Sequence, residues 1–211
     1  MKVKITCFCA LYLQIVQLLN MKEAAGTSEK AKSKESSGPR KIVLPNTITD
    51  RTKAKTYQTG SLLGTGGFAR VFLVTDQVSG NLFANKVIDK EVFKEKKNAK
   101  EKVEREITIH RTLNHNHVVK FISYFEDKMF VHLLLELCPQ KTLLHVARHR
   151  KNVAEFEARF YTRQILEGLH YIHSRGILHR DLKLGNMFLS ESMVIKIGDF
   201  GLATSFEGMI L

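Results

Sequence analysis

The chain has 211 residues, 44% of them hydrophobic, which allows one domain with a sizeable core and excludes a wholly disordered protein. The formal net charge of +12 suggests an anionic partner, but residues 1–56 hold 11 Lys or Arg against 4 Asp or Glu, which is +7 of that total. Because the remainder is only mildly basic, we expect a solvated basic tail and no specific nucleic-acid site. A disulfide framework is excluded and a reducing cytoplasmic or nuclear setting is favoured, since no CxxC pair occurs among Cys7, Cys9 and Cys138.

Residues 1–20 form an apolar N-terminal segment. Two lysines precede an apolar run at 5–19, an outline that is typical of a signal peptide. The run is shorter than a membrane-spanning helix and two glutamines interrupt it, so we expect no membrane association. Alternatively, translation starts at Met21 and the first twenty residues are an extension of the gene model. Residues 21–56 are rich in Lys, Ser and Glu with little apolar periodicity, which predicts a basic, flexible leader.

The pattern changes at about Gly60, where strand-like apolar runs begin. Such runs occur at 71–74 and 82–88, with turn residues between them, and again at 118–125 and 130–137. Residues 91–113, between the second and third of these runs, have helical periodicity instead. The sequence therefore predicts a group of strands interrupted by one helix.

The predicted helix spans residues 91–113 and carries a glutamate on its apolar face. Glu106 falls on the apolar stripe and Glu104 falls off it. A buried glutamate needs a partner of opposite charge, so we favour Glu106 as a functional residue. The stripe itself consists of Val103, Ile107, His110 and Leu113.

The second half of the chain is mainly helical. Helices are predicted at 143–150 and 155–174, and Gly176 is a stop signal after the second one. Residues 187–189 and 194–197 are expected to form a hairpin. The longer helix should pack through a core-facing stripe made of Ala158, Tyr161, Ile165, Leu169 and Ile172.

The most informative motif is the run HRDLKLGN, from His179 to Asn186, which Asp199-Phe200-Gly201 follows thirteen residues later. Phosphoryl transfer from ATP needs a base near the attacking hydroxyl and groups that hold magnesium around the phosphates. Asp181, Asn186 and Asp199 are candidates for these tasks. Two motifs at this spacing favour a phosphoryl-transfer enzyme over a chance match.

Two further motifs lie upstream. The segment Phe83-Ala84-Asn85-Lys86 contains a candidate phosphate-binding lysine. A glycine-rich segment precedes it, and glycine allows backbone N–H groups to approach a triphosphate closely. Taken alone, these glycines are equally compatible with an ordinary hairpin turn. The candidate nucleotide-binding residues of the segment are Leu63, Gly64, Thr65, Gly66, Gly67, Phe68, Ala69 and Val71.

The motifs together resemble the protein kinases, and in particular the polo-like serine/threonine kinases. Ala69 in place of a third glycine and Cys138 in the segment LELC are typical of that family, as are the strings GTGGFA, HRDLKLGN and IGDFGLAT. Val71 is a departure, because polo-like kinases commonly have cysteine there. The resemblance covers roughly residues 57–206. It implies an α+β, kinase-like fold with a complete N-lobe at 57–137, made of a five-stranded antiparallel sheet and one helix, and the first part of a helical C-lobe at 138–211.

The resemblance also implies roles for individual residues. Asp181 would act as the base, and Lys183, typical of serine/threonine kinases, would contact the γ-phosphate of ATP. A Lys86–Glu106 ion pair would hold the lysine against the other phosphates, and Asn186 and Asp199 would bind Mg²⁺. The implied adenine site has apolar walls and backbone hydrogen bonds, supplied by Leu63, Val71, Ala84, Phe188, Glu136 and Cys138. His179 is expected to be structural.

The chain ends at Leu211, ten residues after Gly201 and before the activation segment and lower lobe of the family. Two hypotheses follow. Either the gene encodes an ATP-dependent kinase of protein Ser and Thr, and this sequence is an incomplete record of it, or the chain is a truncated, inactive ATP-binding or interaction fragment. We expect an exposed apolar face on the helix at 155–174. Because secretion would separate an ATP-dependent catalyst from its ATP, a translation start at Met21 is favoured over a signal peptide.

Overall fold

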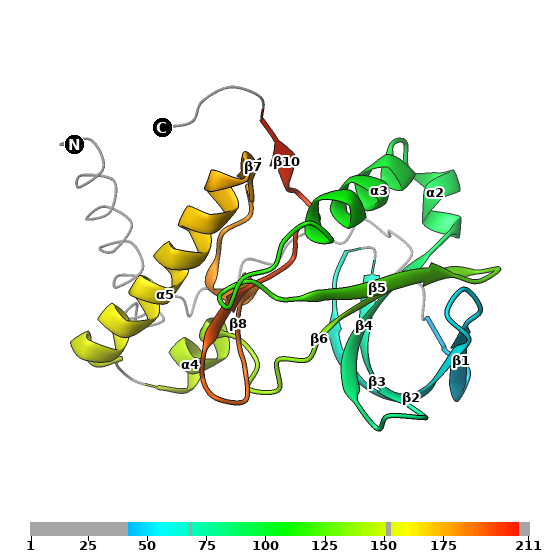
Figure 1. The fold of residues 1–211 in the computed structure, drawn as a ribbon, viewed down its shortest axis with the longest axis horizontal. Coiled ribbons are helices and arrows are strands. Elements are labelled where there is room, and N and C mark those ends of the chain that lie inside the picture. The colour runs from blue at the N-terminus through cyan, green and yellow to red at the C-terminus, as the bar shows by residue number, and fades with distance from the viewer. Residues whose placement is uncertain (1–41, 68, 151–152, 207–211) are drawn as a thin grey trace, which may run out of the picture.

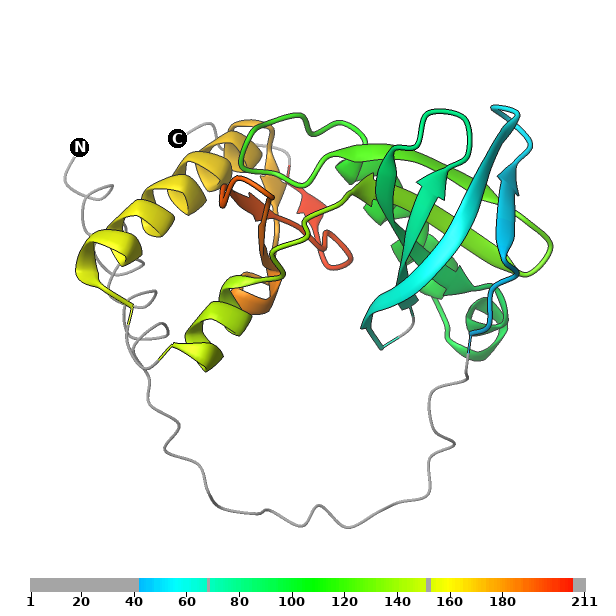
Figure 2. The same ribbon diagram turned by 90° about the horizontal axis from the view of Figure 1, so that it is seen from below.

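The computed structural model describes residues 42–67, 69–150 and 153–206. A curled antiparallel sheet with two helices forms one half of this part of the chain (Figure 1). Two further helices and two short two-stranded sheets form the other half. In the view of Figure 2, the hairpin of β8 (Met187–Leu189) and β9 (Ile195–Ile197) lies between the long helix α5 (Glu155–Ser174) and the sheet. The apolar segment 1–20 and the first part of the predicted leader lie outside the described residues.

The sheet has six strands in the order β1-β2-β3-β4-β6-β5, one more than the five expected. The extra strand is formed by residues that the sequence analysis assigned to the flexible leader. Its four residues, TITD, are too few and too polar to give an apolar run, but Ile48 alternates with exposed positions and packs against Tyr57 and Phe125. The strands are β1 (Thr47–Asp50), β2 (Lys55–Thr65), β3 (Ala69–Asp76), β4 (Leu82–Asp89), β5 (Phe121–Glu126) and β6 (Phe130–Glu136).

The predicted helix at 91–113 is divided into α2 (Glu91–Glu95) and α3 (Ala99–His110). The break occurs because Lys96 is extended and Asn98 has a left-handed conformation, with φ of 65°. The apolar face was predicted correctly, since Glu106 is 5% exposed whereas Glu104 is exposed. The helix therefore turns a carboxylate toward the sheet.

The second half is built around α5 (Glu155–Ser174), which has the predicted bounds. All five residues of its predicted stripe are buried, and they pack into the largest core cluster with residues from the hairpins. Gly176, with φ of 67°, ends the helix in a conformation that favours glycine. The remaining elements are α4 (Leu143–His149), β7 (Ile177–Leu178), the 3₁₀ turn η1 (Leu184–Asn186), β8 (Met187–Leu189), β9 (Ile195–Ile197) and β10 (Thr204–Ser205).

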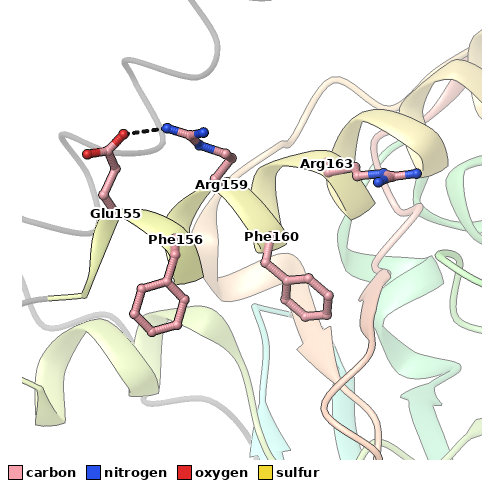
Figure 3. A pocket seen from close by; sticks show the side chains of 5 residues that line it. All are labelled: Glu155, Phe156, Arg159, Phe160 and Arg163. Carbon is pink, nitrogen blue, oxygen red and sulfur yellow. Dashed lines mark hydrogen bonds and ion pairs between the residues drawn. The ribbon is translucent and has the colours of Figure 1, made fainter.

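The outer face of α5 is apolar and open, as expected from the sequence. Phe156 and Phe160 are 74% and 56% exposed. Figure 3 shows both rings projecting from the same side of the helix, away from the Glu155–Arg159 ion pair. These four residues and Arg163 line an open pocket that contains none of the predicted site residues. Within the described part of the chain, no helix is long and apolar enough to cross a membrane.

Candidate active site

A lysine from the sheet joins the two elements that face it. Lys86 lies in β4, where it is opposite Val71 of β3 and Leu133 of β6. Its Nζ lies 2.6 Å from Glu106 Oε1 in α3 and 3.0 Å from Asp199 Oδ1, which follows β9. The ion pair predicted between Lys86 and Glu106 is therefore present, and Asp199 shares the same ammonium group.

The charges of these three side chains support one another. Burial lowers the pKa of Lys86, but the carboxylates of Glu106 and Asp199 outweigh burial and hold this pKa above its usual value. Burial raises the pKa of Asp199, but the Lys86 ammonium outweighs burial and brings that pKa below its usual value. Lys86 and Asp199 are thus both charged at neutral pH, as phosphate binding and metal binding require.

A second group of polar side chains comes from the segment between β7 and β8. Asp181 Oδ2 lies 2.6 Å from Lys183 Nζ. Asn186 Nδ2 donates hydrogen bonds to Asp181 Oδ2 and to the Asp181 carbonyl oxygen, each at 2.9 Å. The side chains of Lys183 and Asp181 are 57% and 26% exposed. The run HRDLKLGN therefore gathers its three candidate residues around one solvent-accessible carboxylate.

His179 connects this segment to the turn that carries Asp199. Its Nδ1 accepts a hydrogen bond from the Asp181 N–H at 3.2 Å, so its Nε2 holds the proton and donates to the Gly198 carbonyl oxygen at 3.0 Å. Burial lowers the pKa of His179, which favours this neutral form. These contacts agree with the structural role that we expected for His179.

The position of Asp199 depends on close packing at the residue before it. A Cβ at Gly198 would come within 2.9 Å of both Phe188 Cε2 and Val119 Cγ2, so glycine fits best between β8 and the loop before β5. The Gly198 N–H also donates to the Asn186 carbonyl oxygen at 3.0 Å. Gly198 therefore fixes the metal-binding candidate relative to both halves of the molecule.

Phe200, on the other side of Asp199, is fully buried between two histidine rings. Its centroid lies 4.6 Å from that of His110 in α3 and 4.9 Å from that of His179. His110 Nε2 in turn bonds the Val119 carbonyl oxygen at 2.7 Å. Burial lowers the pKa of His110 to about 4, so this histidine packs as a neutral ring. The stack holds α3, which carries Glu106, against the turn that carries Asp199.

The predicted adenine walls lie on strands around the lysine. Val71 is opposite Lys86 and Ala84 precedes Lys86 by two residues, so their side chains share one face of the sheet. Leu63 of β2 is 47% exposed, and Phe188 of β8 is partly buried. This face of the sheet thus combines apolar side chains with the buried ammonium, as a nucleotide site requires.

The glycine-rich segment forms the tight connection between β2 and β3. The Gly66 N–H donates to the Ala69 carbonyl oxygen at 2.9 Å. A Cβ at Gly64 or at Gly67 would meet no atom within 4 Å, so packing within the protein does not require glycine there. Close approach of the backbone to a ligand stays our prediction for why glycine occurs at these two positions. Phe68 lies outside the described residues.

The segment after β6 contains the predicted hydrogen-bonding residues for adenine. The Glu136 N–H already donates to the Lys120 carbonyl oxygen at 2.9 Å, so this N–H group belongs to the sheet and is not free for a ligand. Cys138 is partly buried, and burial together with the charge of Glu136 raises the pKa of its thiol to about 12. Cys138 is therefore a neutral thiol beside the expected adenine position.

Comparisons with known proteins agree with this geometry. Residues 57–209 match the family described as "Protein kinase domain". The chain belongs to the protein kinase family. The serine/threonine-protein kinase polo of Drosophila melanogaster is 44% identical over 78% of the chain, PLK2 of Mus musculus 45% over 81%, and PLK1 of Xenopus laevis 46% over 78%. These similarities place the chain with the polo-like serine/threonine kinases, as its motifs predicted.

The chain spans about a quarter of the length of these relatives, with aligned shares of 28%, 24% and 27% of polo, PLK2 and PLK1. For the matched residues, the predicted kinase-like fold and the resemblance to the polo-like kinases are confirmed.

Protein kinases use magnesium, and the side chains of Asp199 and Asn186 fit a magnesium ion that is bound together with a nucleotide. Among the described residues, no group of three or more His, Cys, Asp or Glu side chains could hold a metal ion by itself. Magnesium binds proteins through one or two carboxylate or amide oxygens and takes its other ligands from phosphates and water. Asp199 and Asn186 supply one oxygen-bearing side chain each, which matches that mode.

Some residues of this kinase act through contacts between distant segments, which sequence motifs do not show. Gly198 was not singled out, although glycine directly before Asp199, the candidate metal ligand, could have indicated a close approach. Phe200 and His110 were named only as part of a motif and a stripe, and their ring contact depends on the fold. Lys196 was also missed, although a lysine between the two apolar residues of a strand could have indicated a polar contact on one face.

Proposed function

We propose that this chain contains the nucleotide-binding and catalytic centre of an ATP-dependent polo-like kinase that transfers the γ-phosphate of ATP to Ser or Thr hydroxyls of proteins. One observation carries this proposal. Lys86 lies within 3.0 Å of both Glu106 and Asp199, which come from different elements. A kinase requires this lysine–glutamate pair and the metal-binding aspartate to be in place together before it can transfer phosphate.

The sheet half of the molecule would bind ATP. The backbone of the glycine-rich segment, around Gly64 and Gly67, would face the phosphates, and Val71 and Ala84 would contact the adenine. Lys86 would bind the α- and β-phosphates while Glu106 keeps its ammonium from turning away. Each of these residues positions the nucleotide, so their contribution is to binding and alignment.

The helical half would act on the γ-phosphate and the acceptor. Mg²⁺, when bound with ATP, neutralises phosphate charge, and Asp199 and Asn186 would hold it. Asp181 would accept or orient the proton of the attacking hydroxyl, and the hydrogen bond from Asn186 Nδ2 to Asp181 Oδ2 holds its carboxylate in place. Lys183 lies close enough to Asp181 to contact the same γ-phosphate that the hydroxyl attacks. Positioning and charge neutralisation matter more here than base strength, because the transition state is loose.

The partners and location follow from this chemistry. Protein substrates bearing Ser or Thr and ATP itself are the proposed partners, and a cytoplasmic or nuclear location is where ATP and reduced thiols occur together. The basic residues before position 57 lie mostly outside the described residues and suggest no specific nucleic-acid site.

A second candidate function is non-catalytic binding of nucleotide or of another protein. The exposed Phe156 and Phe160 favour it, since an open apolar face of this kind marks a contact surface. The two candidates differ in whether bound ATP is turned over.

The test is to measure binding of MgATP to the 211-residue chain by titration calorimetry and phosphorylation of a Ser/Thr peptide in parallel. We expect Lys86→Met to abolish binding and Asp181→Asn to leave binding intact while it abolishes transfer. Lys128→Met, at an exposed turn between β5 and β6, is the matched control and should change neither. Binding without transfer in the parent chain would favour the second candidate. Absence of MgATP binding would contradict both nucleotide-dependent proposals.

A further inference from the structure

Lys196 makes contacts that the proposed catalytic roles do not use. It lies in β9 between Ile195 and Ile197, which are fully buried, and its own side chain is 12% exposed on the opposite face. Its Nζ lies 3.0 Å from Glu136 Oε1 and donates a hydrogen bond to the Asn116 carbonyl oxygen, also at 3.0 Å. One ammonium group therefore connects three separate segments of the chain.

The contact with Glu136 is fixed from its other side as well. Glu136 Oε2 accepts a hydrogen bond from the Lys120 backbone N–H at 3.0 Å, so each carboxylate oxygen has a different partner. Glu136 is the last residue of β6, and the segment after it leads to the second half of the molecule. The carboxylate therefore holds Lys196 at the junction where the chain passes between the halves.

Backbone hydrogen bonds reinforce the same junction. The Ile197 N–H donates to the His117 carbonyl oxygen, and the Val119 N–H donates to the Ile197 carbonyl oxygen, both at 2.9 Å. The α3–β5 loop is thus bonded to β9 on both sides of Ile197. The side chain of Lys196 adds a direct contact between β9 and the end of β6, where the Glu136 N–H also donates to the Lys120 carbonyl oxygen of the loop.

The position of Lys196 in the sequence gives the contact its significance. Asp199 follows three residues later, after Gly198, whose tight packing transmits the position of β9 to the aspartate. Adenine is expected beside Glu136 and Cys138, whereas the metal and phosphates are expected beside Asp199. An ATP molecule has to fit both places at once, so the distance between them must match its length.

We infer that Lys196 is a positioning residue that ties the adenine-binding segment to the metal-binding turn and so sets the span of the nucleotide site. This inference rests on the proposed function, because it assumes that ATP binds between these two places. It predicts an effect on ligands that contact both ends of the site and none on a ligand that contacts only the adenine end. A merely structural role of Lys196 would affect both kinds of ligand equally.

The experiment compares MgATP with adenosine as probes of the 211-residue chain, by titration calorimetry. We expect Lys196→Met to weaken MgATP binding about fivefold, a typical size for coupling between two sites, and to change adenosine binding by less than about twofold. Glu136→Gln should act in the same direction, because it removes the charge that holds Lys196. The matched control is Lys120→Met, since Lys120 bonds Glu136 through its backbone N–H and carbonyl oxygen, and its side chain is exposed.

Each outcome decides the inference. Equal losses of MgATP and adenosine affinity, or no loss of either in a parent chain that binds MgATP, would overturn it and leave the proposed function in place. A parent chain that binds adenosine but not MgATP would overturn both. If circular dichroism shows that Lys196→Met does not fold, Glu136→Gln decides, because it keeps the size of the side chain and an acceptor oxygen.

Discussion

The two groups of site residues are built in different ways. Lys86, Glu106 and Asp199 come from a strand, a helix and a turn that are far apart in the sequence, and the pair that joins the first two is largely buried. Asp181, Lys183 and Asn186 come from one run of residues, and Lys183 is mostly exposed. The first group therefore exists only when both halves are folded together, whereas the second group depends on the local course of the chain.

This difference predicts that damage to the first group lowers the stability of the fold and that damage to the second lowers catalysis alone. A buried ion pair leaves an uncompensated charge when one partner is removed, which is strongly destabilising. An exposed pair is solvated and screened, so its loss changes stability little.

The largest expected effect is that of Lys86→Met. It would leave Glu106, 5% exposed in α3, without its ammonium partner, and we expect a loss of about 3 kcal/mol in the free energy of unfolding. Urea unfolding followed by circular dichroism measures this loss. The double variant Lys86→Met with Glu106→Leu removes both charges and should recover much of it. If the single variant is as stable as the parent, the pair contributes nothing to the fold and the comparison fails.

The second prediction concerns pH and the ring stack beside the buried pair. Because the pKa of His110 is about 4 in the folded chain and about 6.5 when exposed, the unfolded state binds more protons between these values. Stability should therefore be constant above about pH 6.5 and fall by roughly 3 kcal/mol as the pH drops toward 4.

The measurement is urea unfolding at several pH values for the parent chain and for His110→Leu. The variant lacks the titrating ring and should lose this part of the pH dependence. Burial also lowers the pKa values of His132 and His179, so some acid sensitivity should remain. An unchanged slope in His110→Leu would show that the His110 ring does not titrate as its burial requires.

The third prediction tests the packing that connects the two groups. Gly198→Ala would place a Cβ within 2.9 Å of Phe188 and Val119, and relief of that clash should cost about 2 kcal/mol of stability. MgATP binding should weaken as well, because Asp199 moves with its neighbour. The matched control is Gly185→Ala, where an added Cβ would lie 3.8 Å from Leu144 Cδ2, an ordinary van der Waals contact. Equal effects of the two substitutions would contradict the role assigned to Gly198.

The difference between the two groups of site residues also explains what could be predicted from the sequence. The run from His179 to Asn186 could be recognised as one group because its residues are neighbours in the chain and a short motif includes them all; the structure brings Asp181, Lys183 and Asn186 together. The bounds of α5 and the burial of Glu106 followed from helical periodicity, which is also a local property.

What the sequence did not predict depends on contacts between distant segments. The strand β1 was missed because four residues with one apolar side chain give no signal until they pair with β2. The break between α2 and α3 depends on the left-handed Asn98, and helical periodicity continues across it. The link from Lys196 to Glu136 joins residues sixty positions apart, and nothing in either local sequence indicates the other.

The smallest expected effect on stability is that of Lys183→Met, and it separates the two groups most clearly. The Asp181 side chain raises the pKa of Lys183 through a hydrogen bond, but the lysine is exposed, so its loss should leave the thermal midpoint unchanged within the error of the measurement. MgATP binding should also persist, because Lys86 and Asp199 are intact. Transfer to a Ser/Thr peptide, in a chain that performs it, should fall by at least about a hundredfold, since the ammonium acts on charge that develops in the transition state. A drop in the thermal midpoint as large as that of Lys86→Met would mean that the exposed pair supports the fold, and the division between a structural and a purely catalytic group would not hold.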